Sequence, residues 1–230
     1  MTKNQERSAA PREGKGGQPA RRKDGMPEGA SARQFKRRAE IIDAAAQTFA
    51  DLGYNASSTQ NIAEVLNLRQ ASLYYYFSTK QDALREVCLI GVQGFVETLE
   101  EICASDRDWA DKVRAGIRHH LLPLREKRAY VKVFQRDRHH VTGPGRKQVG
   151  AVTRHYEGLW QKLIEDGRIN RRFDSRLDAR TATLAILGMC NAASAWLDPE
   201  KPGEIERVAE QFAVIVLCGI LADSGPEKRD

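Results

Sequence analysis

The sequence is poor in the features that mark membrane, exported and disulfide-bonded proteins. None of its apolar runs reaches the roughly 18 residues that a membrane-spanning helix requires. The start, MTKNQERSAAPREGKGG, contains no apolar signal region. Its four cysteines are widely spaced within helical patterns and form no CxxC pair. We therefore expect no membrane partner, a cytoplasmic location, and reduced, mostly buried thiols.

Motifs for catalysis and metal binding are also missing. The sequence contains no GxSxG elbow, Walker loop, GxGxxG or HExxH motif. The members of the adjacent pairs His119-His120 and His139-His140 diverge by about 100° in a helix, so neither pair can bind one metal ion. Surface or partly buried histidines are the simpler interpretation. We predict no catalytic residue, no metal, no cofactor and no enzyme activity.

Positive charge is concentrated at the N-terminus. The formal net charge is +6, and residues 1–38 hold eleven Lys and Arg against four Asp and Glu. Residues 1–30 are also rich in Gly, Pro and Ser, which predicts a disordered basic tail. Two interpretations of this tail stay open, namely nonspecific contact with DNA and no role. Residues 223–230 are expected to form a flexible C-terminus.

The stretch from Thr59 to Lys80 predicts a helix-turn-helix. A short apolar helix pattern (Ile62, Ala63, Leu66) is followed by a turn at residues 67–69 and by a second helix that carries Leu73 and Phe77. Two short amphipathic helices joined by a tight turn can place the second helix in the major groove of DNA. The alternative is a packed helical hairpin with aromatic filler.

Side chains that point away from the hairpin core are the candidate DNA contacts. Three consecutive tyrosines would be unusual in a core, because each buried hydroxyl needs a partner. We predict base contacts from Gln70, Ser72 and Tyr75, and backbone positioning by Ser58, Thr59, Tyr74, Tyr76 and Lys80. Arg69 suits either role. Gln60 at a helix N-terminus and Arg33, Lys36 and Arg37 at the start of the first helix are further phosphate contacts.

Residues 41–84 resemble the N-terminal DNA-binding domain of the tetracycline-repressor (TetR) family. The matching features are Phe49-Ala50, Gly53-Tyr54, Ser58-Thr59, Ile62-Ala63, Leu73-Tyr74-Tyr75-Tyr76-Phe77, and Lys80 with Leu84. Three positions depart from the family pattern, namely Asn67, Arg69 and Ala71. Asn67 replaces a glycine, and Arg69 replaces a capping serine or threonine, which costs about 1 kcal/mol. The operator sequence is therefore expected to differ from those of its relatives.

The rest of the chain reads as helices separated by clear breaks. We expect an all-α fold of about nine helices: residues 32–52, two short helices within 59–77, then 80–104, 109–122, 130–138, 146–166, 175–197 and 204–222. In this reading Gly143-Pro144-Gly145 is a turn and Gly167 ends a helix. Residues 31–79 would form the DNA-binding domain, and residues 80–222 the ligand-binding and dimerisation domain.

The last two helices are apolar nearly all round. The segments TLAILGMCNAASAWL and FAVIVLCGIL contain more apolar residues than one core-facing stripe needs. One interpretation is a buried internal position. The other is a two-fold interface in which two helices from each subunit form a four-helix bundle. The family resemblance favours the second, a homodimer through the last two helices.

Residues 129–221 are similar to TetR-family regulators of fatty-acid and sterol catabolism that respond to acyl-CoA thioesters. The matching residues include Tyr130-Val131, Tyr156-Glu157, Leu159-Trp160, Trp196 and Pro199. The resemblance implies a repressor that a small apolar ligand, best an acyl-CoA, releases from an operator. Candidate pocket residues are Leu99, Ile102, Ile117, Leu121, Phe134, Trp160 and Met189.

A basic cluster lies near the Gly-Pro-Gly segment, and its role is open. It consists of Arg136, Arg138, Arg146, Lys147 and Arg154. It is either a solvated face or a phosphate site at the mouth of a pocket. Two other functions also stay open: the same fold sensing a cationic drug, for which Glu97, Glu100 and Glu101 are the obvious carboxylates, and a helical enzyme or scaffold without DNA function.

Overall fold

The structure, a computed structural model, describes residues 32–221. The predicted basic tail and flexible C-terminus lie outside this range. The chain divides into two compact units, residues 1–38 and 39–230. Of the first unit, the structure describes the first turns of helix α1. The second unit holds the helix-turn-helix, the core and the cavities.

The all-α prediction is confirmed. Residues 32–221 form α1 (Ala32–Leu52), α2 (Thr59–Val65), α3 (Gln70–Leu73), α4 (Lys80–Ala104), α5 (Trp109–Leu121), α6 (Pro123–Glu126), α7 (Arg128–Asp137), α8 (Gly143–Ile169), α9 (Ala179–Ala192) and α10 (Glu204–Ile220), with 3-10 turns η1 (Arg138–His140) and η2 (Ala193–Ala195). The helix that the sequence did not predict is α6. It begins at Pro123, because proline fits the first turn of a helix, where its missing N–H is not needed.

Local signals define the helix-turn-helix. Gly53 ends α1 with a φ of 84°, and Ser58 caps α2 by accepting a hydrogen bond from the Asn61 N–H. Asn67 has a φ of 51°, as the turn requires, and Arg69 begins α3 without a side-chain cap. Leu73 and Phe77 are both buried, as their spacing predicts.

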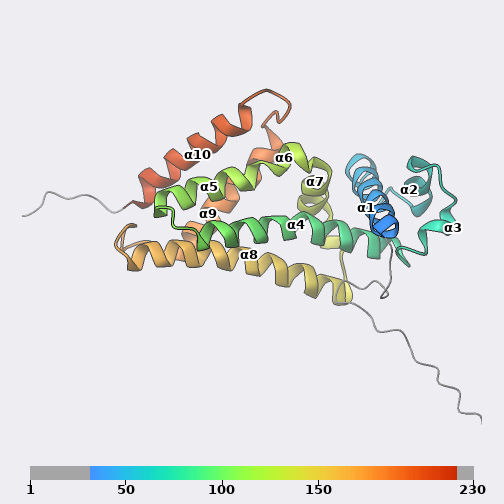
Figure 1. Ribbon diagram of the computed structural model, residues 1–230, viewed down its shortest axis with the longest axis horizontal. Coiled ribbons are helices and arrows are strands. Elements are labelled where there is room, and N and C mark those ends of the chain that lie inside the picture. Colours follow the sequence, from blue (N-terminus) through green and yellow to red (C-terminus); the bar gives the residue numbers. More distant parts are fainter. Residues whose placement is uncertain (1–31, 222–230) are drawn as a thin grey trace, which may run out of the picture. The chain divides into compact units, whose positions relative to one another are not determined.

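The helices of the C-terminal part pack around α4. This helix lies beside α8 along much of its length (Figure 1), and it also packs on α5 and α7. α10 lies on α5, and α9 packs on α8. α2 and α3 lie near the N-terminal end of α4 (Figure 1).

The buried residues form two clusters. One joins α1, α2, α3 and the start of α4 to α7 through side chains such as Phe49, Leu84 and Val133. The other joins the second half of α4 to α5, α8, α9 and α10 around Trp160. Since α4 and α8 contribute to both, the two clusters are held on the same pair of long helices.

Two glycine predictions were wrong. Gly143-Pro144-Gly145 is the first turn of α8 and not a separate turn, because Pro144 sits in the first turn. Gly167 does not end α8, which continues to Ile169. A Cβ on Gly167 would lie 2.3 Å from the ring of Phe173, so glycine makes room for that ring. Arg171, with a φ of 57°, follows the end of the helix.

The two C-terminal helices also differ from their predicted patterns. α9 begins at Ala179, because Asp178 accepts a hydrogen bond from the Thr181 N–H and caps it there. α10 ends at Ile220, and on it the apolar side chain of Ile215 is 61% exposed. A helix that is apolar on nearly every side does not by itself specify which face is buried.

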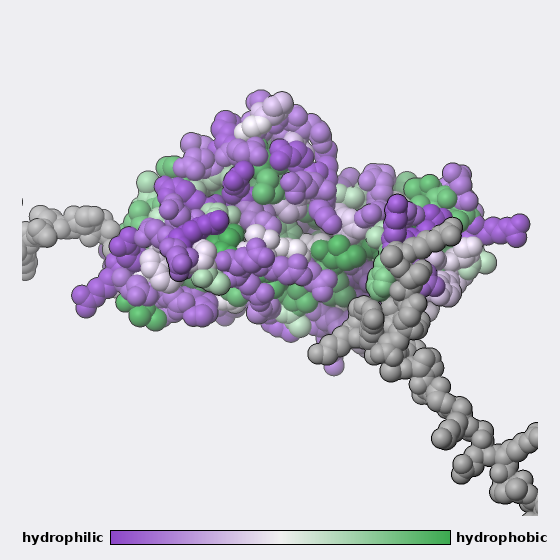
Figure 2. Space-filling view, viewed as in Figure 1, coloured by the Kyte–Doolittle hydropathy of each residue, from purple (hydrophilic) through white to green (hydrophobic). Residues whose placement is uncertain are grey.

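Hydrophilic side chains cover most of the face seen in Figure 2, with smaller apolar patches between them. Every helix within residues 32–221 is too short or too polar to span a membrane. Among the described cysteines, Cys88 and Cys190 are buried, Cys103 is half-buried and Cys218 is exposed.

Candidate DNA-binding helices and ligand cavity

The surface of α3 and the residues after it is aromatic and exposed. Tyr75 is 69% exposed and packs edge-on against the ring of half-buried Tyr76, and Tyr74 is exposed as well. Arg69 and Ser72 are also exposed. These side chains surround the short α3 on the side away from Leu73 and are free to meet another molecule.

Gln70 connects the two helices of the motif. Its side-chain amide donates a 2.6 Å hydrogen bond to the Thr59 hydroxyl at the start of α2 and a longer one, 3.5 Å, to the Tyr74 hydroxyl. Ser58 is occupied with Asn61 in the cap of α2, and exposed Gln60 donates to Glu64. The predicted contact residues Ser58, Thr59, Gln60 and Gln70 therefore lie together at one end of the motif.

The predicted contacts at the start of α1 belong to the first unit. Lys36 is exposed and Arg37 is half-buried. The side chain of Arg33 lies outside the described residues.

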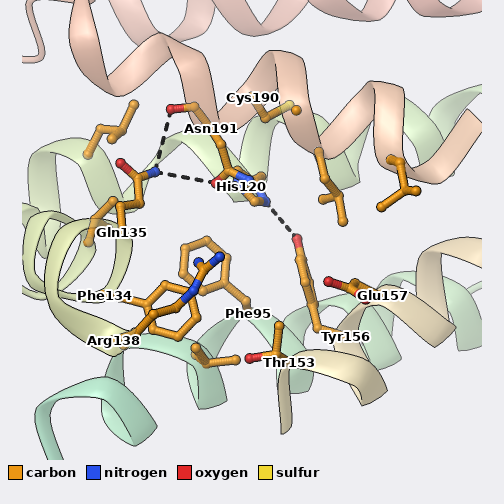
Figure 3. Close-up of a pocket in the computed structure, with 17 residues that line it drawn as sticks. Phe95, His120, Phe134, Gln135, Arg138, Thr153, Tyr156, Glu157, Cys190 and Asn191 are labelled. Carbon is orange, nitrogen blue, oxygen red and sulfur yellow. Dashed lines mark hydrogen bonds between the residues drawn. The ribbon is translucent and has the colours of Figure 1, made fainter. Parts of the chain in front are cut away.

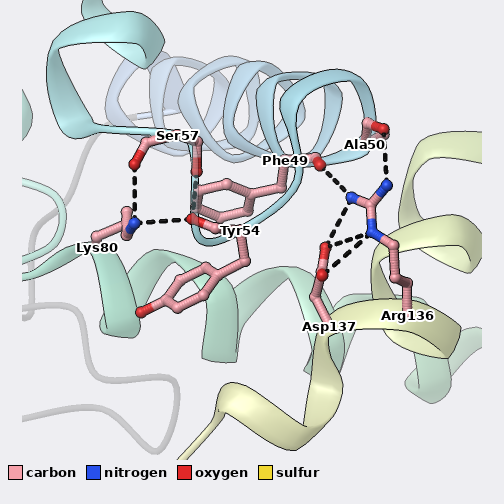
Figure 4. A network of polar contacts seen from close by, with 7 residues as sticks. All are labelled: Phe49, Ala50, Tyr54, Ser57, Lys80, Arg136 and Asp137. Atoms are coloured by element: carbon pink, nitrogen blue, oxygen red, sulfur yellow. Dashed lines mark hydrogen bonds and ion pairs between the residues drawn. The ribbon is translucent and has the colours of Figure 1, made fainter.

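Lys80 fastens the loop before α2. Its ammonium group donates to the carbonyl oxygens of Tyr54 at 2.7 Å and Ser57 at 2.8 Å, and it lies 4.3 Å from the centre of the Tyr54 ring (Figure 4). Two of its three N–H groups are thus used inside the protein. One remains for a phosphate, so the predicted DNA contact and this structural role are compatible.

Helix α7 is hydrogen-bonded to α1. Arg136 donates to the carbonyl oxygens of Phe49 and Ala50 in the last turn of α1 and is held by an ion pair with Asp137 at 2.8 Å (Figure 4). Six residues earlier on α7, the Tyr130 hydroxyl donates to the Asp43 carboxylate at 2.5 Å. A positively charged donor at the C-terminal carbonyls of α1 also suits the helix dipole, so these contacts tie α7 to α1.

The opposite face of α7 lines a cavity of about 240 Å³. Its walls come from α4, α5, α6, α7, η1, α8 and α9 (Figure 3). Apolar walls are formed by Gly91, Val92, Phe95, Leu124, Val131, Phe134, Leu184, Leu187 and Gly188, and polar or sulfur groups by His120, Gln135, Arg138, Thr153, Tyr156, Glu157, Cys190 and Asn191.

Four polar residues on the cavity wall form a continuous relay of hydrogen bonds, which we call the relay. His120 Nδ1 lies 3.0 Å from the Tyr156 hydroxyl, and His120 Nε2 lies 3.3 Å from Asn191 Oδ1 (Figure 3). Gln135 donates to the same Asn191 oxygen at 3.3 Å. Burial lowers the pKa of His120 to about 4 and raises the pKa of Tyr156, so both side chains are neutral near pH 7.

The pocket predicted from the sequence overlaps this cavity at one residue, Phe134. Four others, Leu99, Ile117, Leu121 and Trp160, are closed within the core. Ile102 and Met189 line separate surface hollows. Sequence patterns identify apolar residues that face inward, but they do not distinguish a residue packed against its neighbours from one beside a void.

Two residues of the relay, His120 and Tyr156, were named in the sequence analysis, but not as neighbours. His120 was expected to be a surface or partly buried histidine, and it is partly buried. Tyr156 was among the residues that carry the resemblance to acyl-CoA-responsive regulators. That the two side chains meet, and meet Asn191 from a third helix, depends on tertiary packing.

Only one member of the basic cluster reaches the cavity. Arg138 lines it and stacks over the Phe134 ring at 4.9 Å, whereas Arg136 is bonded to α1. The others, Arg146, Lys147 and Arg154, are exposed on α8. The Arg154 guanidinium lies 3.1 Å from where a Cβ on Gly150 would be, one turn before the cavity-lining Thr153.

Comparison with known families agrees with this architecture. Residues 41–87 match the model of bacterial regulatory proteins of the TetR family, and residues 106–220 match that of the tetracycline-repressor-like C-terminal domain. The chain belongs to the TetR family. It is accordingly a transcriptional repressor with a helix-turn-helix DNA-binding domain and a C-terminal ligand-binding domain, and it is not an enzyme.

Similar proteins include a fatty acid metabolism regulator protein of Bacillus subtilis, which is 21% identical over 182 residues, 79% of this chain and 94% of its own length. The transcriptional repressor KstR2 of Rhodococcus jostii is 26% identical over 189 residues, which are 80% of this chain and 91% of KstR2. Among solved structures, the ketosteroid transcriptional regulator KstR2 of Mycobacterium tuberculosis superimposes with a TM-score of 0.75 at 21% sequence identity. The matched region is 81% of this chain and 96% of the KstR2 chain. AibR in complex with isovaleryl coenzyme A and operator DNA has a TM-score of 0.70 at 21% identity, and the matched region is 78% of this chain and 97% of the AibR chain.

Proposed function

We propose that this TetR-family regulator is a homodimer that binds a palindromic operator and is released from it by an acyl-CoA thioester. The observation that carries the proposal is the position of α7, which lines the cavity with one face and is bonded to α1 with the other. The DNA-binding domain would comprise residues 31–79, and the ligand-binding and dimerisation domain residues 80–222. Such a protein acts where the DNA is, in the cytoplasm.

The outer faces of α9 and α10 support the dimer. Val214, Ile215 and Gly219 on α10 are exposed, as are Leu184 and Ala185 on α9. Between the two helices lies a mostly apolar hollow whose walls include Ala185, Met189, Ile215 and Gly219. Exposed apolar residues at helical spacing and small residues that permit close approach favour a second copy of the same pair of helices. The interface would be a four-helix bundle.

Two copies would present two α3 helices to DNA. In helix-turn-helix dimers the half-sites lie roughly 34–36 Å apart, or a multiple of this. Gln70, Ser72 and Tyr75 would contact base edges, while Thr59, Tyr74, Tyr76 and Lys80 would contact phosphates. The hydrogen bond from Gln70 to Thr59 supports this division, because it orients the Gln70 amide beside the start of α2.

The shape and charge of the cavity support an acyl-CoA. Its volume of about 240 Å³ lies just below the roughly 300–1,000 Å³ typical of sites that enclose a whole drug-sized ligand. The cavity would therefore hold an apolar acyl group and leave a bulky head group outside. Arg138 on the wall and exposed Arg146 and Arg154 on α8 provide positive charge for phosphates. The coenzyme A ester bound by AibR is of the same chemical class.

One observation favours a second ligand class. Glu157 lines the cavity, and a carboxylate there would suit a cationic ligand. The carboxylates expected from the sequence for this purpose, Glu97, Glu100 and Glu101, are exposed and do not line the cavity, and Glu100 pairs with His155 at 2.8 Å. A cationic drug is therefore the alternative ligand, resting on Glu157.

Ligand release would act through α7. A ligand that favours one position of Val131, Phe134 and Gln135 also favours one position of Tyr130 and Arg136 on the same helix, and so of α1. Repression is lost if the ligand-bound position separates the two α3 helices by the wrong distance.

A binding assay tests the proposal. Fluorescence anisotropy of a duplex from upstream of the protein's own gene should show binding at low salt, which CoA thioesters reverse and cationic dyes do not. Gln70→Ala should relax discrimination at one base position in a half-site library, with Gln148→Ala on α8 as the control. A chain that ignores every duplex from its own locus contradicts the DNA-binding proposal, and release by dyes alone contradicts the ligand class.

A second experiment tests the dimer. Ile215→Glu should yield a monomer at micromolar concentration in analytical ultracentrifugation, because it buries two carboxylates at the proposed interface. Gln211→Glu, one turn earlier on the same exposed face of α10, adds the same charge nearer the edge and should have a smaller effect. A wild-type chain that is monomeric at this concentration would contradict the proposal.

A further inference from the structure

The relay has a definite direction of hydrogen bonding. Asn191 Oδ1 can only accept, so His120 Nε2 and Gln135 Nε2 both donate to it. Because His120 is neutral near pH 7, its Nδ1 carries no proton and accepts from the Tyr156 hydroxyl. The reverse orientation of the Asn191 amide would place its NH₂ group against two donors.

This orientation leaves hydrogen-bond donors at the cavity wall. The NH₂ group of Asn191 has no hydrogen-bond partner among residues 32–221, and Asn191 lines the cavity. The Gln135 amide donates to both the side-chain and the main-chain oxygen of Asn191, whereas the Tyr156 hydroxyl can turn from His120 toward another acceptor. The relay thus presents donors to whatever occupies the cavity.

Apolar side chains share the cavity wall with the relay. Phe95, Phe134 and Leu187 belong to the same cavity wall, and Figure 3 shows Arg138 entering beside Phe134 and Phe95, while the relay runs beneath α9. The cavity is proposed to hold the acyl group and to leave the phosphate-bearing head group outside, so an acceptor that meets the relay inside it is not a phosphate. It is an oxygen on the apolar body of the ligand.

We propose that Asn191 and Tyr156, oriented by His120 and Gln135, recognise a carbonyl oxygen on the acyl body of the ligand, so that the protein prefers a keto-substituted acyl-CoA to the unsubstituted one. This inference rests on the acyl-CoA class proposed above. A carbonyl fits better than a hydroxyl because the relay offers donors and a carbonyl only accepts. An unsubstituted acyl body cannot accept this hydrogen bond, so we expect it to bind more weakly.

A matched pair of probes tests the preference. The probes are 4-oxocyclohexanecarboxyl-CoA and cyclohexanecarboxyl-CoA, which differ by one ketone oxygen, and each is to be titrated into the full-length protein in an isothermal calorimeter. The wild-type chain is expected to bind the keto probe about tenfold more tightly. Asn191→Ala and Tyr156→Phe should each bring the two affinities within about twofold, mainly by weakening the keto probe.

Thr153→Val is the control variant. Thr153 lines the same cavity, but its hydroxyl donates to the Val149 carbonyl within α8, so its removal should keep the preference. Asn191 is exposed, so Asn191→Ala keeps the test valid even if Tyr156→Phe folds poorly. Equal binding of the two probes by the wild-type chain, or an unchanged preference in Asn191→Ala, overturns the relay proposal alone. Binding of neither probe overturns the acyl-CoA class and the relay proposal with it.

Discussion

Arg136 on α7 donates a hydrogen bond to the carbonyl oxygen of Phe49 in the last turn of α1. The neighbouring Asp137 is buried and holds the guanidinium in place, which raises the pKa of Arg136 still further above the neutral range. The contact therefore joins the cavity-lining helix to the DNA-binding domain with a permanently charged donor.

Arg136→Ala is expected to uncouple ligand binding from DNA release. Operator affinity without ligand should stay within about threefold of wild type, whereas the weakening of operator binding by a saturating CoA thioester should fall at least tenfold, about 1.4 kcal/mol of coupling. Lys132→Ala, which removes an exposed positive charge from the same helix, is the control. Anisotropy titrations with and without the thioester measure both quantities. Full ligand-induced release in Arg136→Ala would contradict the coupling role.

Lys80→Met should lower both stability and DNA affinity. Loss of the two hydrogen bonds to Tyr54 and Ser57 is expected to reduce the free energy of unfolding by about 2 kcal/mol, measured by urea denaturation. Binding should weaken for all DNA sequences alike, with the slope of log K against log salt reduced by about 1. Lys147→Met, at an exposed site on α8, should leave stability nearly unchanged. Loss on a single operator variant would rule out the phosphate contact.

Gly167→Ala should destabilise the protein by about 1–3 kcal/mol, because the new methyl group overlaps the ring of buried Phe173. Gly158→Ala in the same helix is the matched control, since no atom lies within 4 Å of its added Cβ. It should stabilise the protein by up to about 1 kcal/mol, the usual gain for alanine in a helix interior. Thermal unfolding of both variants checks the pair. Equal effects would mean that Phe173 moves aside without cost.

Acidification from pH 7 to pH 5 should destabilise the protein through His120. Its folded pKa of about 4 lies below the ordinary 6.5, so the unfolded chain binds more protons in this window. The stability from the neutral imidazole is complete above pH 6.5 and is lost as the pH falls toward 4, by about 2 kcal/mol at pH 5. Urea titrations of His120→Gln should show a smaller pH dependence, and those of exposed His139→Gln should match wild type. If the free energy of unfolding of His120→Gln depended on pH as that of wild type does, burial would not lower the pKa of His120.

The DNA-binding half was predictable because its signals are local. A glycine ends α1, a serine caps α2, an asparagine takes the left-handed turn, and Leu73 and Phe77 lie four residues apart, so each is visible within a few residues of sequence. The start of α4 follows in the same way from Thr79, whose side chain caps it by accepting from the Asp82 N–H. Helix type and helix ends are set largely by interactions between near neighbours in the chain.

The cavity and the outer face of α10 were decided by tertiary structure alone. Leu99, Ile117 and Trp160 were predicted to line the cavity, yet all three are packed within the core. Whether an inward-facing apolar residue lines a cavity depends on side chains from several other helices, which the local sequence does not specify. The relay brings together residues 120, 135, 156 and 191, whose separation along the chain leaves no periodic signal. Sequence by itself determined an all-α regulator with a helix-turn-helix, since these follow from local propensity and periodicity. Which polar groups meet inside it was decided by packing between distant helices.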